Sequence, residues 1–199
     1  MRLISHAHRR RALVPWLAAI AVAAIPALFA ASPAFAEEGL FSVGAHIGPM
    51  FPILYHPDVD EVGVEPAIGY GLHAGYGISA RATAAIEYVH GDTSADVDQD
   101  DGTESVDVGL DLLLAEIAWE PSDATIRPVF LGGVDWLAIR ADKPLEGESD
   151  FGFHFGMGFD VQAARSVVAG LRARYHLFLP QDYDSAHLVS LLAQVRYLF

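Results

Sequence analysis

A chain of 199 residues suits one domain, or one domain with a targeting segment, and its formal net charge of −14 disfavours nucleic acid as a partner, because phosphate binding needs clustered lysine and arginine. The sequence contains no cysteine, which excludes thiol catalysis, disulfides and thiolate metal sites. Hydrophobic residues make up 52% of the chain, yet no run of about 18 apolar residues follows Ala36, so a bundle of membrane helices is not expected either.

The first 36 residues have the composition of a secretory signal peptide. Four arginines form a basic start, an apolar run begins at residue 12, and residues 34–36 (Ala-Phe-Ala) give the small-x-small pattern of a cleavage site. We expect residues 1–36 to be removed and residues 37–199 to form the mature domain. Its net charge is −18, because the segment carries four of the 12 basic residues and none of the 26 acidic ones. The alternative is an uncleaved membrane anchor, which two prolines and the Ala-x-Ala site disfavour.

After residue 36, polar and apolar side chains alternate at every second position, which is the spacing of β-strands. In chain order, strands are expected at residues 40–48, 64–78, 82–90, 105–119, 125–139, 151–162, 167–177 and 187–199. The clearest is 151–162, where Phe151, Phe153 and Phe155 begin an unbroken alternation with glycine and polar residues. The segment 105–119 also fits the apolar stripe of a helix. If it is a strand, Glu116 falls on the outward, apolar face, and a bulge that shifts the register is the preferred explanation.

The connections between these strands alternate in length. Short turns are expected at residues 79–81, 120–124 and 163–165, and longer loops at 49–63, 91–104, 140–150 and 179–186. In lipid only helices and closed barrels satisfy their backbone groups, so the pattern predicts an all-β, eight-stranded, antiparallel, up-and-down transmembrane β-barrel. Aromatic girdle positions are expected at Tyr88, Trp119, Trp136, Tyr175 and Tyr197. A soluble lipocalin-like barrel would need the inverse pattern, with polar outer faces and an apolar cavity.

With the leader, the eight alternating segments, the unequal loops and the terminal Tyr-Leu-Phe, the chain resembles the small eight-stranded bacterial outer-membrane barrels of the OmpA membrane-domain and OmpX kind. The resemblance covers the mature chain and implies location in the bacterial outer membrane and contact with outer-membrane lipid. It also implies recognition by the barrel-assembly machinery, with Tyr197 and Phe199 as the signal. About activity the resemblance says little.

The alternation directs a set of polar side chains into the barrel lumen, because the apolar face must meet lipid. The expected polar network comprises Glu87, Asp107, Asp111, Arg127, Asp135, His154, Asp160, Arg172, Arg174 and Arg196, with His46, His73 and His176 also directed inward. A barrel of eight strands leaves no room for an aqueous channel, so we expect paired charges to fill it. Arg172, Arg174 and Arg196 should each contact a carboxylate. The alternative is a narrow channel in which the same groups select the ions or small solutes that pass.

Residues 91–104 contain six acidic residues and suggest a possible cation site. Asp96, Asp98 and Asp100 stand at alternate positions with Asp107 beyond them, but Gly102 comes one place too late for an EF-hand loop. A solvated, mobile acidic loop is preferred to an ordered calcium site.

Two further groups of residues could carry chemistry. Ser185 and His187 share a strand face near Asp182 and Asp184, which is a weak signal for a lipid-A-modifying enzyme. The mature chain holds seven histidines, but no His-x-His pair on one strand supports a metal site, and neither a metal nor a cofactor is expected.

The sequence therefore predicts a non-enzymatic, monomeric outer-membrane barrel. Its expected role is structural or surface-interactive: envelope integrity, adhesion or recognition through acidic extracellular loops. Because such loops repel anionic lipopolysaccharide, divalent cations are expected to bridge them to the outer leaflet.

Overall fold

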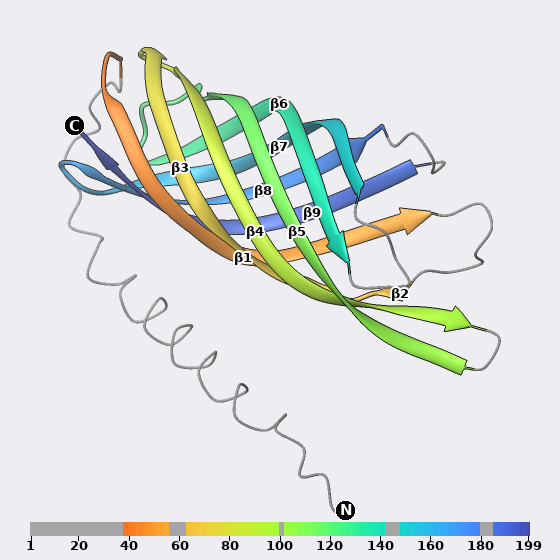
Figure 1. Cartoon of the computed structure of the whole chain (residues 1–199). Coiled ribbons are helices and arrows are strands. Elements are labelled where there is room, and N and C mark those ends of the chain that lie inside the picture. Colours follow the sequence, from red (N-terminus) through yellow and green to blue (C-terminus); the bar gives the residue numbers. More distant parts are fainter. Residues whose placement is uncertain (1–37, 56–62, 100–101, 142–147, 180–184) are drawn as a thin grey trace, which may run out of the picture.

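The computed structural model describes residues 38–55, 63–99, 102–141, 148–179 and 185–199, so the expected signal peptide lies outside the described residues. Within them the chain forms nine β-strands (Figure 1). They are β1 (Phe41–Tyr55), β2 (Gly63–Val64), β3 (Ala67–Ser79), β4 (Ala82–Gln99), β5 (Gly102–Trp119), β6 (Ile126–Ala141), β7 (Glu148–Ala164), β8 (Val167–Phe178) and β9 (Ser185–Leu198). No helix in this part of the chain has the length and apolarity to cross a membrane.

The eight long strands close into a cylinder. Each pairs antiparallel with its neighbour along the chain, and β1 pairs antiparallel with β9, which removes both sheet edges. The seam continues to the last residue, since the backbone amides of Phe41 and Phe199 each donate to the other's carbonyl at 3.0 Å. The two-residue strand β2 pairs with β4 beside the end of β3. The predicted closed eight-stranded antiparallel barrel is confirmed.

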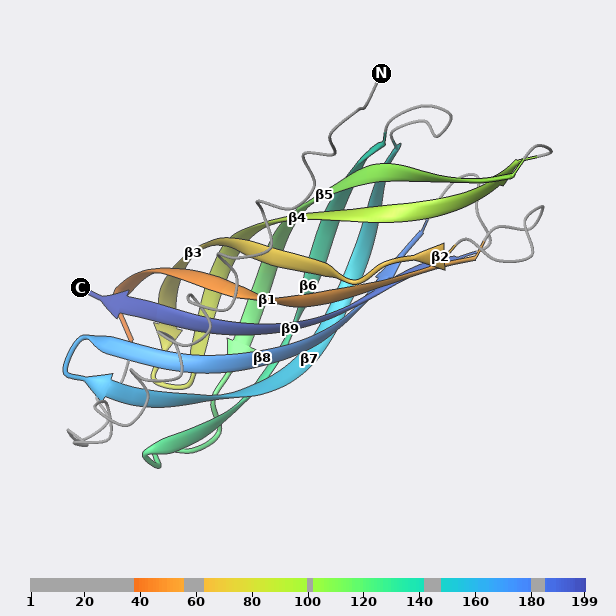
Figure 2. The ribbon, with the colours of Figure 1, turned by 90° about the horizontal axis from the view of Figure 1, so that it is seen from below.

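The two ends of the barrel differ. Tight connections join β3 to β4, β5 to β6 and β7 to β8 at the end where the described chain begins and finishes. At the opposite end the β4–β5 hairpin extends past its neighbours (Figure 2). In barrels of this type the short turns and termini lie in the periplasm, so the hairpin marks the extracellular end.

Two segments expected as loops are instead strand. β1 continues beyond Gly48 to Tyr55, and most of residues 91–104 lies in the paired arms of β4 and β5. The physical reason is that the inward positions stay apolar: Met50 is buried in the lumen, and Ala95 is buried opposite Val106. The expectation of an acidic loop was wrong for the paired part of this segment.

The outer face of the barrel is apolar. Phe151, Phe153 and Phe155 are 51%, 47% and 63% exposed, whereas Arg196 is 1% exposed and faces the lumen. On a protein in the outer membrane, such side chains contact lipid rather than water.

Strand β5 reverses the facing expected from the sequence. It is a strand and not a helix, its pairing with β4 and β6 runs without a shift, and Glu116 points inward with no bulge. Consequently Asp107 and Asp111, which were expected in the lumen, face outward. The reason is that Leu110 and Leu112, with the other even-numbered residues, pack inside the barrel.

An apolar cluster fills the extracellular half of the lumen. Its buried members are Met50, Ala67, Val89, Ala95, Val108, Leu110, Leu112, Leu114, Leu137, Phe178, Leu188 and Leu192. Most lie on the parts of their strands that approach the extracellular end, whereas Leu114 and Leu192 are paired with Glu87 and Arg172 of the charged layer. This cluster confines the charged side chains to the middle and the periplasmic half.

Candidate functional site

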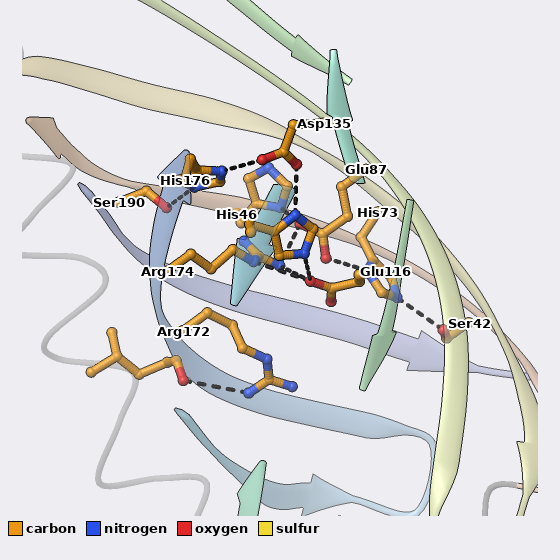
Figure 3. A network of polar contacts seen from close by, with 12 residues as sticks. Ser42, His46, His73, Glu87, Glu116, Asp135, Arg172, Arg174, His176 and Ser190 are labelled. Carbon is orange, nitrogen blue, oxygen red and sulfur yellow. Dashed lines mark hydrogen bonds and ion pairs between the residues drawn. The ribbon is translucent and has the colours of Figure 1, made fainter. Parts of the chain in front are cut away.

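Arg174 on β8 is the centre of the polar network in the middle of the lumen (Figure 3). Its Nη2 donates to Glu87 Oε2 at 2.8 Å, and its Nε donates to Glu116 Oε2 at 3.1 Å. The three side chains are each at most 2% exposed. Charge-assisted hydrogen bonds of this kind are the form in which charges can remain buried.

A serine and a histidine extend the network from Glu87 towards the periplasmic end. Glu87 Oε1 is hydrogen-bonded to His73 Nδ1 at 2.9 Å, and His73 Nε2 to Ser42 Oγ at 3.2 Å (Figure 3). His46 Nδ1 lies 3.6 Å from Glu87 Oε2. Glu87 therefore faces two imidazoles as well as Arg174.

A second series of hydrogen bonds, again through a carboxylate, a histidine and a serine, starts at Asp135 on β6. Asp135 Oδ2 is hydrogen-bonded to His176 Nδ1 at 2.8 Å, and His176 Nε2 to Ser190 Oγ at 3.0 Å (Figure 3). The other oxygen of Asp135 lies 2.6 Å from Nδ1 of His154, whose Nε2 is 3.3 Å from Glu116 Oε2. One ligand atom from each of Asp135, His154 and His176 falls within 4.8 Å of the others, so these residues could hold a metal ion.

Together these contacts form one continuous chain across the lumen. In order, it runs through Ser190, His176, Asp135, His154, Glu116, Arg174, Glu87, His73 and Ser42. These residues come from β9, β8, β6, β7, β5, β4, β3 and β1, so every long strand contributes at least one. The network thus links side chains from all eight strands of the barrel wall.

Both serine–histidine–acid chains have the connectivity of a catalytic triad, but the backbone around them does not suit acyl transfer. Ser42 and Ser190 lie within strands whose registers continue on both sides, and they are 4% and 1% exposed. An oxyanion hole needs donors aimed at an open reacting position. Here the neighbouring backbone groups serve the sheet, and the hydroxyls are enclosed.

A separate polar group closes the periplasmic half of the lumen. Both oxygens of Asp160 contact Arg172, at 2.7 and 2.8 Å, and Oδ2 also contacts Arg196. Glu120 lies 2.9 Å from Arg127 Nη1 and 3.7 Å from Arg196 Nη2. Three arginines meet two carboxylates here, whereas the central network has three carboxylates and one arginine.

The structure places most of the sequence-predicted network in the lumen. Buried there are Glu87, Arg127, Asp135, His154, Asp160, Arg172, Arg174 and Arg196, together with His46, His73 and His176. Each of Arg172, Arg174 and Arg196 contacts at least one buried carboxylate. Asp107 is exposed, and Asp111 instead contacts Tyr88, His90 and Arg140 on the outside of the barrel.

Sequence reasoning missed four contributors: Ser42, Glu116, Glu120 and Ser190. The signal for Glu116 was present, since it shares parity with Leu112 and Leu114, but acidic residues stand on both faces of β5. Of the weaker candidates, His187 is hydrogen-bonded to Tyr175 Oη at 2.8 Å. Asp100, Asp182 and Asp184 lie outside the described residues.

Comparisons with known proteins agree with this architecture. A family model described as "Outer membrane protein beta-barrel domain" matches residues 20–196. No curated protein sequence matches the chain significantly.

Three solved structures illustrate the likeness. The outer membrane protein OprG of Pseudomonas aeruginosa aligns with a TM-score of 0.61 and 11% identity over 82% of this chain and 97% of its own. Neisserial surface protein A, NspA, aligns at 0.62 and 16% over 81% and 100%. Ail, the attachment invasion locus protein of Yersinia pestis, solved with the heparin analogue sucrose octasulfate, aligns at 0.54 and 13% over 81% and 99%. At these identities the likeness concerns the fold alone.

Proposed function

Since the chain belongs to the outer membrane protein beta-barrel domain family, we propose that it is a monomeric, non-enzymatic and non-conducting barrel of the bacterial outer membrane, which acts as a structural or surface-interacting protein. The observation that carries the proposal is the filled lumen. An apolar cluster closes its extracellular half, and paired charges close the remainder.

The filled lumen argues against ion conduction. Conduction needs a water-filled path with binding sites weak enough for an ion to leave. Val89 and Leu112 are each 1% exposed and are paired with each other on the extracellular side of Glu87. Below them, Arg172, Arg174 and Arg196 each make two or more carboxylate contacts or hydrogen bonds, so these three guanidinium groups are not free to guide an ion.

The exterior is where a partner can reach the protein. Each arm of the β4–β5 hairpin has 18 residues, about 60 Å of strand, which at a tilt of about 45° rises some 40 Å against an apolar band of about 25 Å. Its outward residues Asp92, Asp96 and Asp107 are exposed. The hairpin therefore presents negative charge beyond the membrane surface.

This charge decides which partners are plausible. Ail was solved with a sulfated polyanion, but an acidic hairpin would repel such a ligand, so we do not extend that property to this chain. Anionic lipopolysaccharide would be repelled as well unless Mg²⁺ or Ca²⁺ bridges its phosphates to the hairpin. We propose that contact with the outer leaflet depends on such cations.

Recording from planar lipid bilayers tests the proposed function. Protein whose folded insertion has been verified should give no discrete conductance steps, whereas a reference porin inserted by the same procedure should give them. Unitary steps that appear only with the folded protein would overturn the non-conducting assignment.

A further inference from the structure

We propose that Asp135, His154 and His176 bind one divalent transition-metal ion, of the zinc type, inside the barrel. The site is independent of the surface role proposed above. It rests on the convergence of the three side chains, on the partners of their remaining atoms and on the charge of the central network.

The three ligand atoms already face one another. Nδ1 of His154 and Nδ1 of His176 lie 2.6 and 2.8 Å from the two oxygens of Asp135. Around a tetrahedral zinc ion, with bonds of about 2.0–2.1 Å, neighbouring ligand atoms are about 3.3 Å apart. Each ring would therefore have to move about 0.5–0.7 Å away from its carboxylate oxygen. One ligand atom from each of the three residues already lies within 4.8 Å of the other two, so the ion would also draw these atoms together.

The backbone provides this arrangement. The ligands come from three adjacent strands, and His154 on β7 is paired directly with His176 on β8. Gly133 lies opposite His154 on β6, and a Cβ there would come within 2.8 Å of His154 Cε1. The absence of a side chain at Gly133 leaves room for the imidazole.

The far nitrogen of each imidazole has its own partner. Nε2 of His154 faces Glu116 at 3.3 Å, and Nε2 of His176 faces Ser190 at 3.0 Å. Histidines that bind metals usually have their second nitrogen held by a carboxylate, a carbonyl or water, which fixes the ring and directs the other nitrogen at the ion. Here a serine hydroxyl holds Nε2 of His176, and Nε2 of His154 lies within ion-pair distance of Glu116 without making a hydrogen bond, so each second nitrogen faces an oxygen and leaves Nδ1 for the ion.

The central network also holds more carboxylates than guanidinium groups. Among the described residues it holds the carboxylates Glu87, Glu116 and Asp135, but one guanidinium, that of Arg174. Arg174 contacts the two glutamates, whereas the ion-pair partners recorded for Asp135 are both imidazoles. One divalent cation beside Asp135 would give this carboxylate a metal cation as partner, whereas Arg174 serves the two glutamates.

The donor set selects the class of metal. Two imidazole nitrogens and one carboxylate oxygen suit Zn²⁺ and its neighbours in the first transition series, and not Mg²⁺ or Ca²⁺, which prefer oxygen. Three protein ligands leave one position for water. This preference separates the lumen site from the Mg²⁺ or Ca²⁺ contacts proposed for the hairpin.

Refolding in the presence of the metal tests the proposal, because the ion then need not cross the filled lumen. Protein without a histidine tag is unfolded with a chelator and refolded in detergent at graded free concentrations of ZnCl₂, and its zinc content is measured after gel filtration. One zinc per chain is expected, and Co²⁺ in its place should give the visible absorption of a four- or five-coordinate site. No bound metal, or only six-coordinate Co²⁺, would overturn the proposal.

Variants locate the ion. Asp135→Asn and His176→Gln should each weaken binding by about a hundredfold, whereas His73→Gln, which alters an equally buried histidine of the Ser42–Glu87 chain, should leave it within about threefold. Circular dichroism checks that each variant folds. If neither ligand variant folds, zinc must still raise the melting temperature of the wild-type and His73→Gln proteins. Unchanged binding in a folded ligand variant, or unchanged melting in those two proteins, would refute the assignment.

Discussion

Arg174 and Arg140 place the same guanidinium group in two different surroundings. Arg174 is 1% exposed and contacts Glu87 and Glu116, whereas Arg140 is 67% exposed and contacts Asp111 on the outside. Removing one partner of a buried ion pair strands a charge in a medium of low polarity, but water solvates the partner of an exposed pair. The two arginines should therefore differ greatly in their effect on stability.

We predict that Arg174→Met lowers the free energy of unfolding by about 3–5 kcal/mol, because two carboxylates lose their cation. Arg140→Met, the matched control, should lower it by less than about 1 kcal/mol. Urea unfolding of the protein in detergent micelles measures both. Equal losses for the two variants would show that the central network is not a low-polarity, sealed environment.

At the scale of single residues, alternation predicted which face a side chain occupies on every long strand except β5, but not the depth of the side chain or its neighbours. Arg172, Arg174 and Arg196 were expected to face inward because they alternate along their strands with apolar and aromatic residues, which face the lipid. The convergence of Asp135, His154 and His176 could not be predicted, because it depends on the stagger between strands, which parity does not reveal.

At the scale of elements, the sequence located every long strand but shortened those that extend beyond the membrane. β4 was expected to end at residue 90 but continues to Gln99. Burial of Ala95 against Val106 stabilises the pairing there, although the outward residues are acidic. The facing of β5 was predicted wrongly because the charged residues Asp107 and Asp111 were expected in the lumen. In the structure the leucines of the other face pack inside, and the two aspartates face outward. Recognition of Tyr197 and Phe199 by the assembly machinery is tested by none of these observations and stays a prediction.

The acidic hairpin gives the prediction at this scale. In membranes that contain lipopolysaccharide, removal of Mg²⁺ and Ca²⁺ with a chelator should speed proteolysis of the β4–β5 hairpin several-fold, because the cation bridges are lost. The variant Asp92→Asn/Asp96→Asn/Asp107→Asn controls for loosening of the lipid layer itself and should respond less. Equal responses of the two proteins, or no response of the wild type, would count against cation-dependent contact.

At the scale of the whole molecule, closure and filling depend on each other. The β1–β9 seam removes the sheet edges, and a cylinder of eight strands leaves an interior that side chains can fill. Apolar residues fill the extracellular half. Two polar groups and a small apolar cluster of Ala118, Val129 and Leu131 occupy the rest, and the central polar group links all eight long strands. The wall and the filling therefore form one cooperative unit.

Water access to the lumen is the most direct test of this account. The chain has no cysteine, so Ser190→Cys introduces a single thiol of similar size in the central network, and Ser105→Cys introduces one on the exposed face of β5. With a charged, membrane-impermeant thiol reagent, Ser105→Cys should react at once, and Ser190→Cys should react at least about 100-fold more slowly until the barrel is unfolded. Reaction of folded Ser190→Cys at a rate within about tenfold of Ser105→Cys would show an open lumen and contradict the sealed barrel.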